Sequence, residues 1–336
     1  MNKNHWLAEL HERSVRDFVN LLSPVNGILA GEPDPRDFIY RGYGSEKYEL
    51  VPSAFRGRRP PFPDRRRVGD RTNENQIRAE IEQLRGFCRL ADSRGLRLPE
   101  DSQRLWQILE EYRNDDFLDG VAKGDAAWPP DELLSVLALA QHYGVPTRLL
   151  DWTRSSYVAA YFAAISAIEN RHKGQLVVWA IDRSPFESES QWAWLKDRIK
   201  IVTAPAVDIP NLFAQQGLFL LFRERGFTKS AHFNAPSYEN ILVRQLDVDP
   251  YDRPILFKFT LPTGQAPELL RILSTLGIDG SSIFPGYAGV ARALKEQLLH
   301  PMPGSWYDSP SARSARQQYA NVWRRWRRNL QKGRAT

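Results

Sequence analysis

The sequence predicts an α+β fold, and three features point to it. Segments with the periodicity of amphipathic helices are mixed with short apolar runs typical of strands. These segments follow one another without the regular strand–helix–strand rhythm of a doubly wound sheet. The chain of 336 residues, 42 % of them hydrophobic, can bury a large core and contains no internal repeat. We therefore expect a globular α+β protein with one large or two modest domains.

The first 75 residues predict one helix, one strand and a loop. Apolar residues at 7, 10, 15, 18, 19 and 22 have helical spacing, so a helix is predicted over residues 6–22. Residues 37–42 have the pattern of a short strand that ends at Gly42, and residues 48–56 are expected to be partly helical. Residues 57–75 are rich in Arg, Pro, Gly and Asp, a composition typical of a mobile loop.

The rest of the chain predicts further helices and strands from the same two periodicities. Helical patterns cover residues 76–90, 105–117, 132–143, 156–170, 268–276 and 319–330. Apolar runs bounded by polar or turn residues predict strands at 175–181, 218–222 and 255–261. The segment 156–170 is apolar on nearly all sides, so we expect its helix to be buried.

The net charge of +6 is concentrated in the C-terminal tail. Residues 309–336 carry eight Lys and Arg residues and no acid, which leaves 38 basic and 40 acidic residues in the rest of the chain. With Trp323 and Trp326 interleaved, this tail and the Arg-rich loop 56–78 are typical of contacts to nucleic-acid phosphates. The alternative is that the tail is a solvated amphipathic helix docked on the body of the protein.

Several classes of chemistry and location are disfavoured by the composition. The single cysteine, Cys88, excludes an internal disulfide and a thiolate-rich metal site. No Gly-rich phosphate loop or Gly-x-Ser-x-Gly elbow is present, and the six His residues are dispersed, so no metal site is expected. No apolar run is long enough to span a bilayer, and the N-terminus lacks an apolar signal core. We expect a cytoplasmic protein without a membrane contact.

The most informative segment is the run AQHYGVPTRLLDWT at residues 140–153. It places His, Thr, Arg, Asp and Trp side chains around a glycine and a proline, with apolar runs on both sides. Unpaired polar groups are costly to bury, so a core segment has no need of so many. Polar groups positioned between buried elements are typical of a binding or catalytic site. The segment therefore predicts a functional site.

Each polar residue near this segment also has a plainer interpretation. Arg41 in the tripeptide Tyr40-Arg41-Gly42 could grip a phosphate or carboxylate with its planar fork, or could be a solvated arginine in a surface turn. Thr153, Ser155 and Ser156 could present a helix start to an anion, or could simply cap the helix.

Three further residues have two interpretations as well. Asp151 could orient His142 or Arg148, or could only pair with Arg148. Trp152 could stack on a flat ligand or could fill the core. Gln216, before Gly217, could face the site or could satisfy the backbone of its loop.

The order and spacing of several motifs resemble the FRG-domain family. The matching pieces are residues 40–42 (YRG), 50–56 (LVPSAFR), 141–153 (QHYGVPTRLLDWT), 159–163 (AAYFA), 216–219 (QGLF) and the late motif over 277–285 (GID followed by SIFP). The resemblance covers roughly residues 36–300. It divides the chain into a helical N-terminal segment over 1–35, an FRG-like domain over 36–300 and a basic tail over 301–336.

The resemblance implies a split β-sheet core similar to that of ADP-ribosyltransferases, with a helical N-terminal part and a helical C-terminal tail. It implies an enzyme that consumes NAD as substrate, either as a transferase or as a glycohydrolase, and acts as a toxin or anti-phage effector. In such folds an Arg lies on a first strand, a hydroxyl residue precedes a helix, and a Glu often lies on a later strand. Arg41 and Thr153 match the first two positions, and Gln216 stands at the third.

The resemblance also implies roles for individual side chains. Catalytic roles are expected for Arg41 on phosphate or ribose, Thr153 at the ribose side, Gln216 on a ribose hydroxyl, Asp151 as the nearby charge and His142 as its orienter or a proton carrier. Ligand-binding roles are expected for Tyr40, Gly42, Tyr143, Thr147, Arg148 and Trp152, and Tyr43 is a further candidate for the aromatic wall. The acceptor is an unknown protein or nucleic acid.

Two other functions are consistent with the same residues. One is a nucleic-acid-binding module or nuclease that uses the basic tail, and the other is a pseudoenzyme that senses NAD or ADP-ribose. The transferase and the pseudoenzyme both require the candidate residues to form one ligand site. Polar ends of apolar segments gather at one sheet edge, so the side chains of Arg41, His142, Arg148, Asp151, Thr153 and Gln216 are predicted to converge on one cleft.

We expect His142, Asp151 and Thr153 to be largely buried and Arg41 to be open to this cleft. An alternative places Arg148 and Asp151 in a buried ion pair just beneath it.

Overall fold

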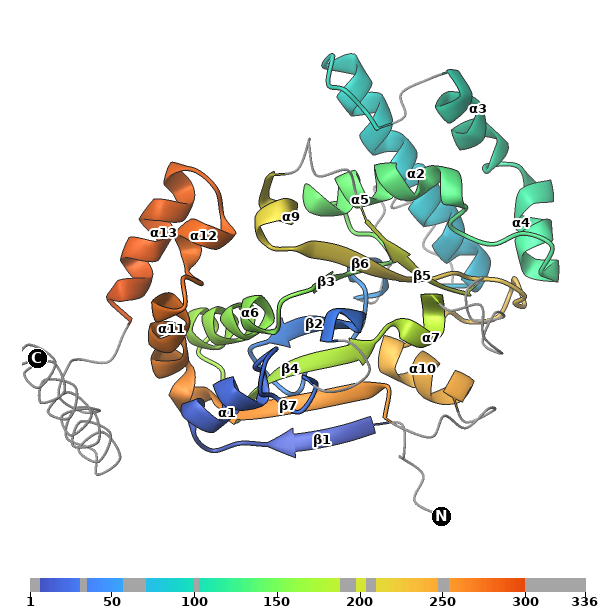
Figure 1. The fold of residues 1–336 in the computed structure, drawn as a ribbon. Helices are drawn as coiled ribbons and strands as arrows, with labels where there is room; N and C mark the ends of the chain where they lie inside the picture. The colour runs from blue at the N-terminus through green and yellow to red at the C-terminus, as the bar shows by residue number, and fades with distance from the viewer. Residues whose placement is uncertain are drawn as a thin grey trace, which may run out of the picture.

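The computed structural model describes residues 7–30, 35–56, 71–99, 103–187, 198–203, 210–246 and 254–299. Its centre is a seven-stranded sheet of order β1-β7-β4-β2-β3-β6-β5, antiparallel throughout except for the parallel pair β1–β7 (Figure 1). The strands are β1 (Leu7–His11), β2 (Phe38–Tyr43), β3 (Leu149–Thr153), β4 (Gln175–Asp182), β5 (Ile199–Val202), β6 (Gly217–Phe222) and β7 (Leu256–Pro262).

Helices cover both faces of this sheet (Figure 1). The longer helices are α1 (Val15–Leu21), α2 (Asn73–Ser93), α3 (Gln103–Glu111), α4 (Asp115–Lys123), α5 (Leu134–His142), α6 (Ser156–Glu169), α10 (Tyr238–Leu246), α11 (Ala266–Thr275) and α13 (Tyr287–Gln297). Short helices are α7 (Ser184–Glu187), α9 (Pro210–Ala214) and α12 (Gly280–Ile283). The predicted α+β mixture of helices and strands is confirmed.

Most of the predicted helices and strands are present, but the predicted start of the first helix was wrong. Residues 7–11 form β1, which pairs in parallel with β7 from Leu7↔Leu256 to His11↔Thr260, and the helix begins only at Val15. The long-range pairing overrides the local helical spacing, since β1 gains its backbone partners from a strand about 250 residues away. The predicted helix at 105–117 is two helices, because Asn114 is extended and begins α4.

Two predictions fall outside the described residues. The basic helix expected at 319–330 lies there with the rest of the tail, and so does most of the Arg-rich loop, from 57 to 70. The nucleic-acid hypothesis therefore stays a prediction. Among the described helices, none is both long and apolar enough to cross a membrane.

The sheet is split between its two central strands. β2 pairs with β4 over six residues, but within the described residues its pairing with β3 is limited to Tyr40↔Thr153. Beyond this pair the two strands diverge, and the segments Arg41–Tyr43 and Leu149–Trp152 have no ladder between them. The sheet therefore consists of a β1-β7-β4-β2 half and a β3-β6-β5 half, joined at one point.

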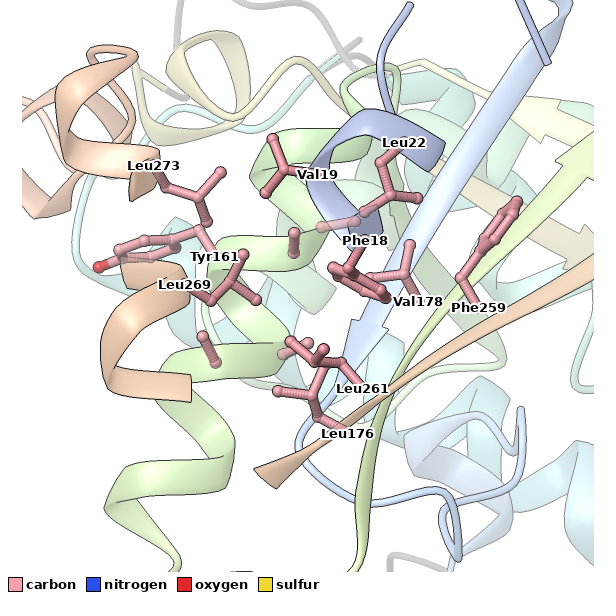
Figure 2. Packing of buried hydrophobic residues seen from close by; sticks show 14 of the residues in the cluster. Phe18, Val19, Leu22, Tyr161, Leu176, Val178, Phe259, Leu261, Leu269 and Leu273 are labelled. Atoms are coloured by element: carbon pink, nitrogen blue, oxygen red, sulfur yellow. The ribbon is translucent and has the colours of Figure 1, made fainter. Parts of the chain in front are cut away.

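Two hydrophobic cores lie on the same face of the sheet, one on each half. The α6 core packs α1, α6 and α11 on β2, β4 and β7, and includes Tyr40 and Phe18 (Figure 2). The helical-layer core packs α2–α5 on β3, β5 and β6, and includes Leu149 and Phe219.

The register relates these two cores across the split. The side chains of cross-strand partners point to the same face of a sheet, so Tyr40 and Thr153 share a face. Leu149 lies four residues before Thr153 on the same strand, so its side chain points to that face as well. A third cluster, the opposite-face core, contains Trp152 and Trp179 and covers the other side. The split thus lies beneath the gap between the α6 core and the helical-layer core.

Glycine allows α6 to approach β2 closely at the edge of this split. A Cβ atom on Gly42 would lie 1.9 Å from the carbonyl oxygen of Ala159, so no larger residue fits without moving the helix. Helix α6 begins after Ser155, whose hydroxyl accepts a hydrogen bond from the Val158 N–H at 3.3 Å. Nine of its 14 residues are buried, in agreement with the prediction from its sequence.

Candidate ligand pocket in the split of the sheet

A pocket of about 360 Å³ opens where β2 and β3 diverge. Its volume lies in the range of about 300–1,000 Å³ that is usual for small-molecule sites. The lining comes from β2, β3, β6, helix α6, the end of α5, and α9 with the turn that follows it. Most of these residues lie in the FRG-like motifs, and the fold gathers residues that are up to 179 positions apart in the sequence, from Tyr40 to Phe219.

Arg41 bridges the two strands at the split. Its Nη1 donates a short hydrogen bond to the carbonyl oxygen of Asp151 and lies 3.5 Å from the Asp151 carboxylate. The guanidinium also stacks over the Tyr43 ring, 4.6 Å from its centroid. This cation therefore takes the place of part of the backbone ladder that β2 and β3 lack.

Arg41 keeps its charge at this position. Its side chain is only 14 % exposed. Burial by itself lowers the pKa of Arg41, but the nearby Tyr43 oxygen and the Asp151 carboxylate raise it, and the net pKa is above the ordinary value. Only Nη1 of this guanidinium donates hydrogen bonds to the residues that the structure describes. The remaining donors can serve a ligand.

Asp151 is positioned by Gln141 from the end of α5. The Gln141 Nε2 atom donates to both Asp151 carboxylate oxygens, at 3.3 and 3.2 Å. The Gln141 Oε1 atom accepts from the Thr147 hydroxyl at 2.9 Å, and that hydroxyl in turn accepts from the Leu149 N–H. A chain of hydrogen bonds thus connects the buried start of β3 to the carboxylate. The expectation that Asp151 is buried was wrong, since its side chain is 56 % exposed and lines the pocket.

Three residues of the pocket lining carry buried polar atoms without a hydrogen-bond partner. They are the Arg41 Nε, the Tyr43 hydroxyl and the Trp152 Nε1. Buried polar groups are usually paired, because an unpaired group loses its hydration without compensation. Their concentration around one pocket is typical of a site prepared for a polar ligand or ordered water.

His142 lines the same pocket and is half-buried. Burial lowers the pKa of His142 below its ordinary value, and the charge of Asp151 only partly opposes this shift. The imidazole is therefore neutral at neutral pH and can accept a proton. The expectation of a largely buried His142 was too strong, whereas Thr153 is buried as predicted.

Thr153 is in the pocket, but its hydroxyl is engaged with the backbone. It donates to the Gln215 carbonyl oxygen at 2.7 Å and accepts from the Ser155 N–H at 3.1 Å. Thr153 therefore fixes the start of α6 against the turn before β6. Tyr40 and Trp152 are buried and line the pocket while also filling the cores on either face. Burial raises the pKa of Tyr40 to about 12, so its phenol stays neutral.

Gln216 does not reach the pocket, and the adjacent Gln215 does. Gln216 has a φ of +48°, an uncommon conformation for a residue with a side chain, and it is exposed. Its backbone closes the turn, with its N–H donating to Phe213 and its carbonyl accepting from the Arg154 N–H. The prediction that Gln216 faces the cleft was therefore wrong by one residue, because the left-handed turn directs the neighbouring amide inward.

Arg148 and Thr147 support the scaffold instead of lining this pocket. Arg148 is 1 % exposed and donates to the two carboxylate oxygens of Glu80, at 2.6 and 3.0 Å. The alternative of an Arg148–Asp151 ion pair was wrong, because Asp151 pairs with Arg41. Thr147 is buried in the hydrogen-bond chain to Gln141. Tyr143 is 66 % exposed and is also absent from the lining.

Besides Gln215, sequence reasoning missed other residues that line the pocket or support it. Phe162 and Ser166 come from α6, Leu212 from α9, and Gln141 holds Asp151 from α5. The helical spacing of Ala159, Phe162 and Ser166 is a signal that could have placed them on one face of α6. The roles of Gln141 and Gln215 carry no comparable signal, because an amide in a loop most often satisfies nearby backbone.

Comparisons with known proteins give one family. No curated protein and no solved structure matches the chain. The chain matches the FRG domain over residues 36–173, from just before β2 to the turn after α6. That span contains Arg41, His142, Asp151 and Thr153, all in the pocket lining, whereas Gln215 lies beyond it. Over residues 36–173, this match supports the FRG family that the motifs predict.

Proposed function

We propose that the pocket binds NAD and that the protein is an NAD-consuming ADP-ribosyltransferase-like enzyme. The observation that carries the proposal is the placement of Arg41. Its guanidinium reaches across the split of the sheet, beside the exposed carboxylate of Asp151, in a pocket with an aromatic wall. An arginine suits the diphosphate or a ribose hydroxyl, and a carboxylate suits a sugar that becomes cationic.

The reaction breaks the bond between ribose C1′ and the nicotinamide nitrogen. The electron pair of that bond leaves with nicotinamide, and the ribose gains positive charge at C1′. Asp151 supplies the negative charge that stabilises this state, and the hydrogen bonds from Gln141 hold the carboxylate in place. Arg41 anchors the diphosphate so that C1′ lies near Asp151. Phe162, Tyr43 and Trp152 provide flat apolar surface for the nicotinamide ring.

The second half of the reaction adds a nucleophile to C1′. An oxygen or nitrogen of the acceptor, or a water molecule, forms the new bond and loses a proton. His142 is neutral and lines the pocket, so it can take this proton. Transfer to a protein or nucleic acid and hydrolysis by water share all steps except the choice of nucleophile.

Release of nicotinamide from NAD tests the proposal. We expect release by the full chain, at least about a hundredfold less with Arg41→Ala or Asp151→Asn, and no loss with Arg16→Ala or Asp17→Asn. Arg16 and Asp17 are exposed on α1, away from the pocket, and match the two substitutions in chemistry. Thermal unfolding of each variant checks that the fold is retained.

The outcomes separate the enzyme from its alternatives. Binding of NAD without release, in the presence of candidate protein and nucleic-acid acceptors, would identify a sensing pseudoenzyme. Absence of both binding and release would overturn the assignment of this pocket. An effector that depletes NAD should also lower the NAD content of cells that express it, and Arg41→Ala should abolish that effect.

A further inference from the structure

A second pocket lies on the opposite face of the sheet from the split pocket. Its volume is about 230 Å³, and strands β1, β7 and β4 form its floor. Trp179 and Leu256 of this floor belong to the opposite-face core. The segment after β2 contributes Glu46, Tyr48 and Glu49, and α10 contributes Glu239.

The lining of this acidic pocket carries a strong excess of negative charge. Four glutamates face it, and the single lysine of the lining, Lys258, lies 3.4 Å from one of them, Glu9. The other three, Glu46, Glu49 and Glu239, have no ion pair with any residue that the structure describes. Because the glutamates outnumber the lysine, the pocket has unused capacity for a cation.

Trp179 provides a second and independent indication of a ligand. Its side chain is 4 % exposed, yet its indole Nε1 has no hydrogen-bond partner. The Lys258 ammonium lies 5.5 Å from the centroid of the ring, so the ring already interacts with one cation. An indole N–H donates only, so its hydrogen-bond partner must be an acceptor atom.

We propose that this acidic pocket binds a lysine or arginine residue of a basic peptide. The cationic side chain would be held by Glu46 and Glu49 and packed against the rings of Trp179 and Tyr48. The peptide carbonyl beside that side chain would accept from the Trp179 Nε1. A basic peptide offers a cation and a carbonyl acceptor a few bonds apart, whereas a free polyamine offers only the cation. The proposal goes beyond NAD consumption and does not depend on it.

Calorimetric titration of the full chain with a tetra-arginine peptide tests the binding. We expect saturable binding that weakens as the salt concentration rises, and at least about tenfold weaker binding by the double variant Glu46→Gln/Glu49→Gln. Both glutamates are exposed and have no ion pair, so the fold should be retained. Glu132→Gln changes an exposed glutamate in the turn before α5, outside the lining of the acidic pocket, and this control should bind as the parent does.

Two further variants give results that a purely non-specific acidic surface would not. Lys258→Met removes the internal cation that competes for Glu9 and the Trp179 ring, so it should bind the peptide several-fold more tightly. Trp179→Phe removes the N–H donor and keeps an aromatic ring, so it should weaken binding of the peptide more than binding of spermidine. Equal affinity of the parent and the double glutamine variant would overturn the proposal, as would weaker binding by Lys258→Met. Spermidine that binds as tightly as the peptide would show a site for polyamines instead.

Discussion

Arg148, which is buried, and Arg41, which is partly buried, have different hydrogen-bond partners. Arg148, at the start of β3, is 1 % exposed and has its guanidinium paired through two hydrogen bonds with Glu80, which is 4 % exposed. Arg41, near the end of β2, is 14 % exposed, and only its Nη1 donates to described residues. Glu80 also accepts a hydrogen bond from the Trp128 indole, so both members of the Arg148 pair have further hydrogen-bond or ring contacts with the protein.

The two arginines have the same side chain and differ in how many of its hydrogen-bond donors have protein partners. This difference, more than residue type, distinguishes a residue that supports the fold from a residue that can bind a ligand. The Arg148 guanidinium uses all three of its nitrogens in hydrogen bonds to Glu80 and to the Trp128 carbonyl oxygen, and it stabilises the packing of α2 against β3. An arginine in a pocket that has donors without protein partners can donate hydrogen bonds to a ligand. The same contrast holds along the motif at 140–153, where Thr147 and Arg148 face the scaffold and His142 and Asp151 face the pocket.

The largest expected effect comes from breaking the Arg148 pair. Glu80→Ala should lower the free energy of unfolding by about 3–5 kcal/mol, because it leaves a buried guanidinium without its counter-charge. Urea unfolding measures this. Arg41→Ala should cost clearly less in the same assay, since its carboxylate partner is exposed. Equal losses for the two variants would remove the distinction between them.

An intermediate effect is expected at Gln141, the residue that connects the two regions. Gln141→Leu removes the hydrogen bonds to Thr147 and to Asp151, so unfolding should be easier by about 1–2 kcal/mol. Nicotinamide release should fall roughly tenfold, because Asp151 loses its fixed orientation. Unfolding and release are measured on the same preparation. Loss of stability with full activity would mean that Gln141 supports only the scaffold.

The smallest effect concerns the pH dependence set by His142. Its pKa is lowered by burial, so the folded state protonates at lower pH than the unfolded chain. The base therefore stays active down to a pH below roughly 6.5, and stability declines as the pH falls through the same range. Asp151→Asn removes the charge that raises the pKa of His142, so it should move the acidic limb to still lower pH. NMR titration of the imidazole follows this, and a shift to higher pH would contradict the assignment.

The sequence was sufficient to predict those features of the fold and the site that depend on one local segment. The apolar surroundings of 156–170 predicted the buried α6, and the pattern at 37–42 placed Arg41 on a strand beside a closely packed glycine. The motif at 140–153 indicated a functional segment, and His142, Asp151 and Thr153 do line one pocket with Arg41.

The sequence was insufficient where partners come from distant segments. Strand β1 depends on β7, and the Arg148 partner Glu80 lies 68 residues earlier on α2. Neither pairing leaves a local signal in the sequence. Gln215 lines the pocket instead of Gln216 because Gln216 has a positive φ, and neither composition nor periodicity predicts that backbone conformation.

The central claim is that Arg41 serves a ligand and Arg148 serves the fold. Calorimetric titration of NAD into the parent chain, Arg41→Ala and the surface control Arg16→Ala tests it most directly. We predict saturable binding by the parent and by Arg16→Ala, and at least tenfold weaker binding by an Arg41→Ala variant that is still folded. Arg41→Ala that binds NAD as tightly as the parent would contradict the account.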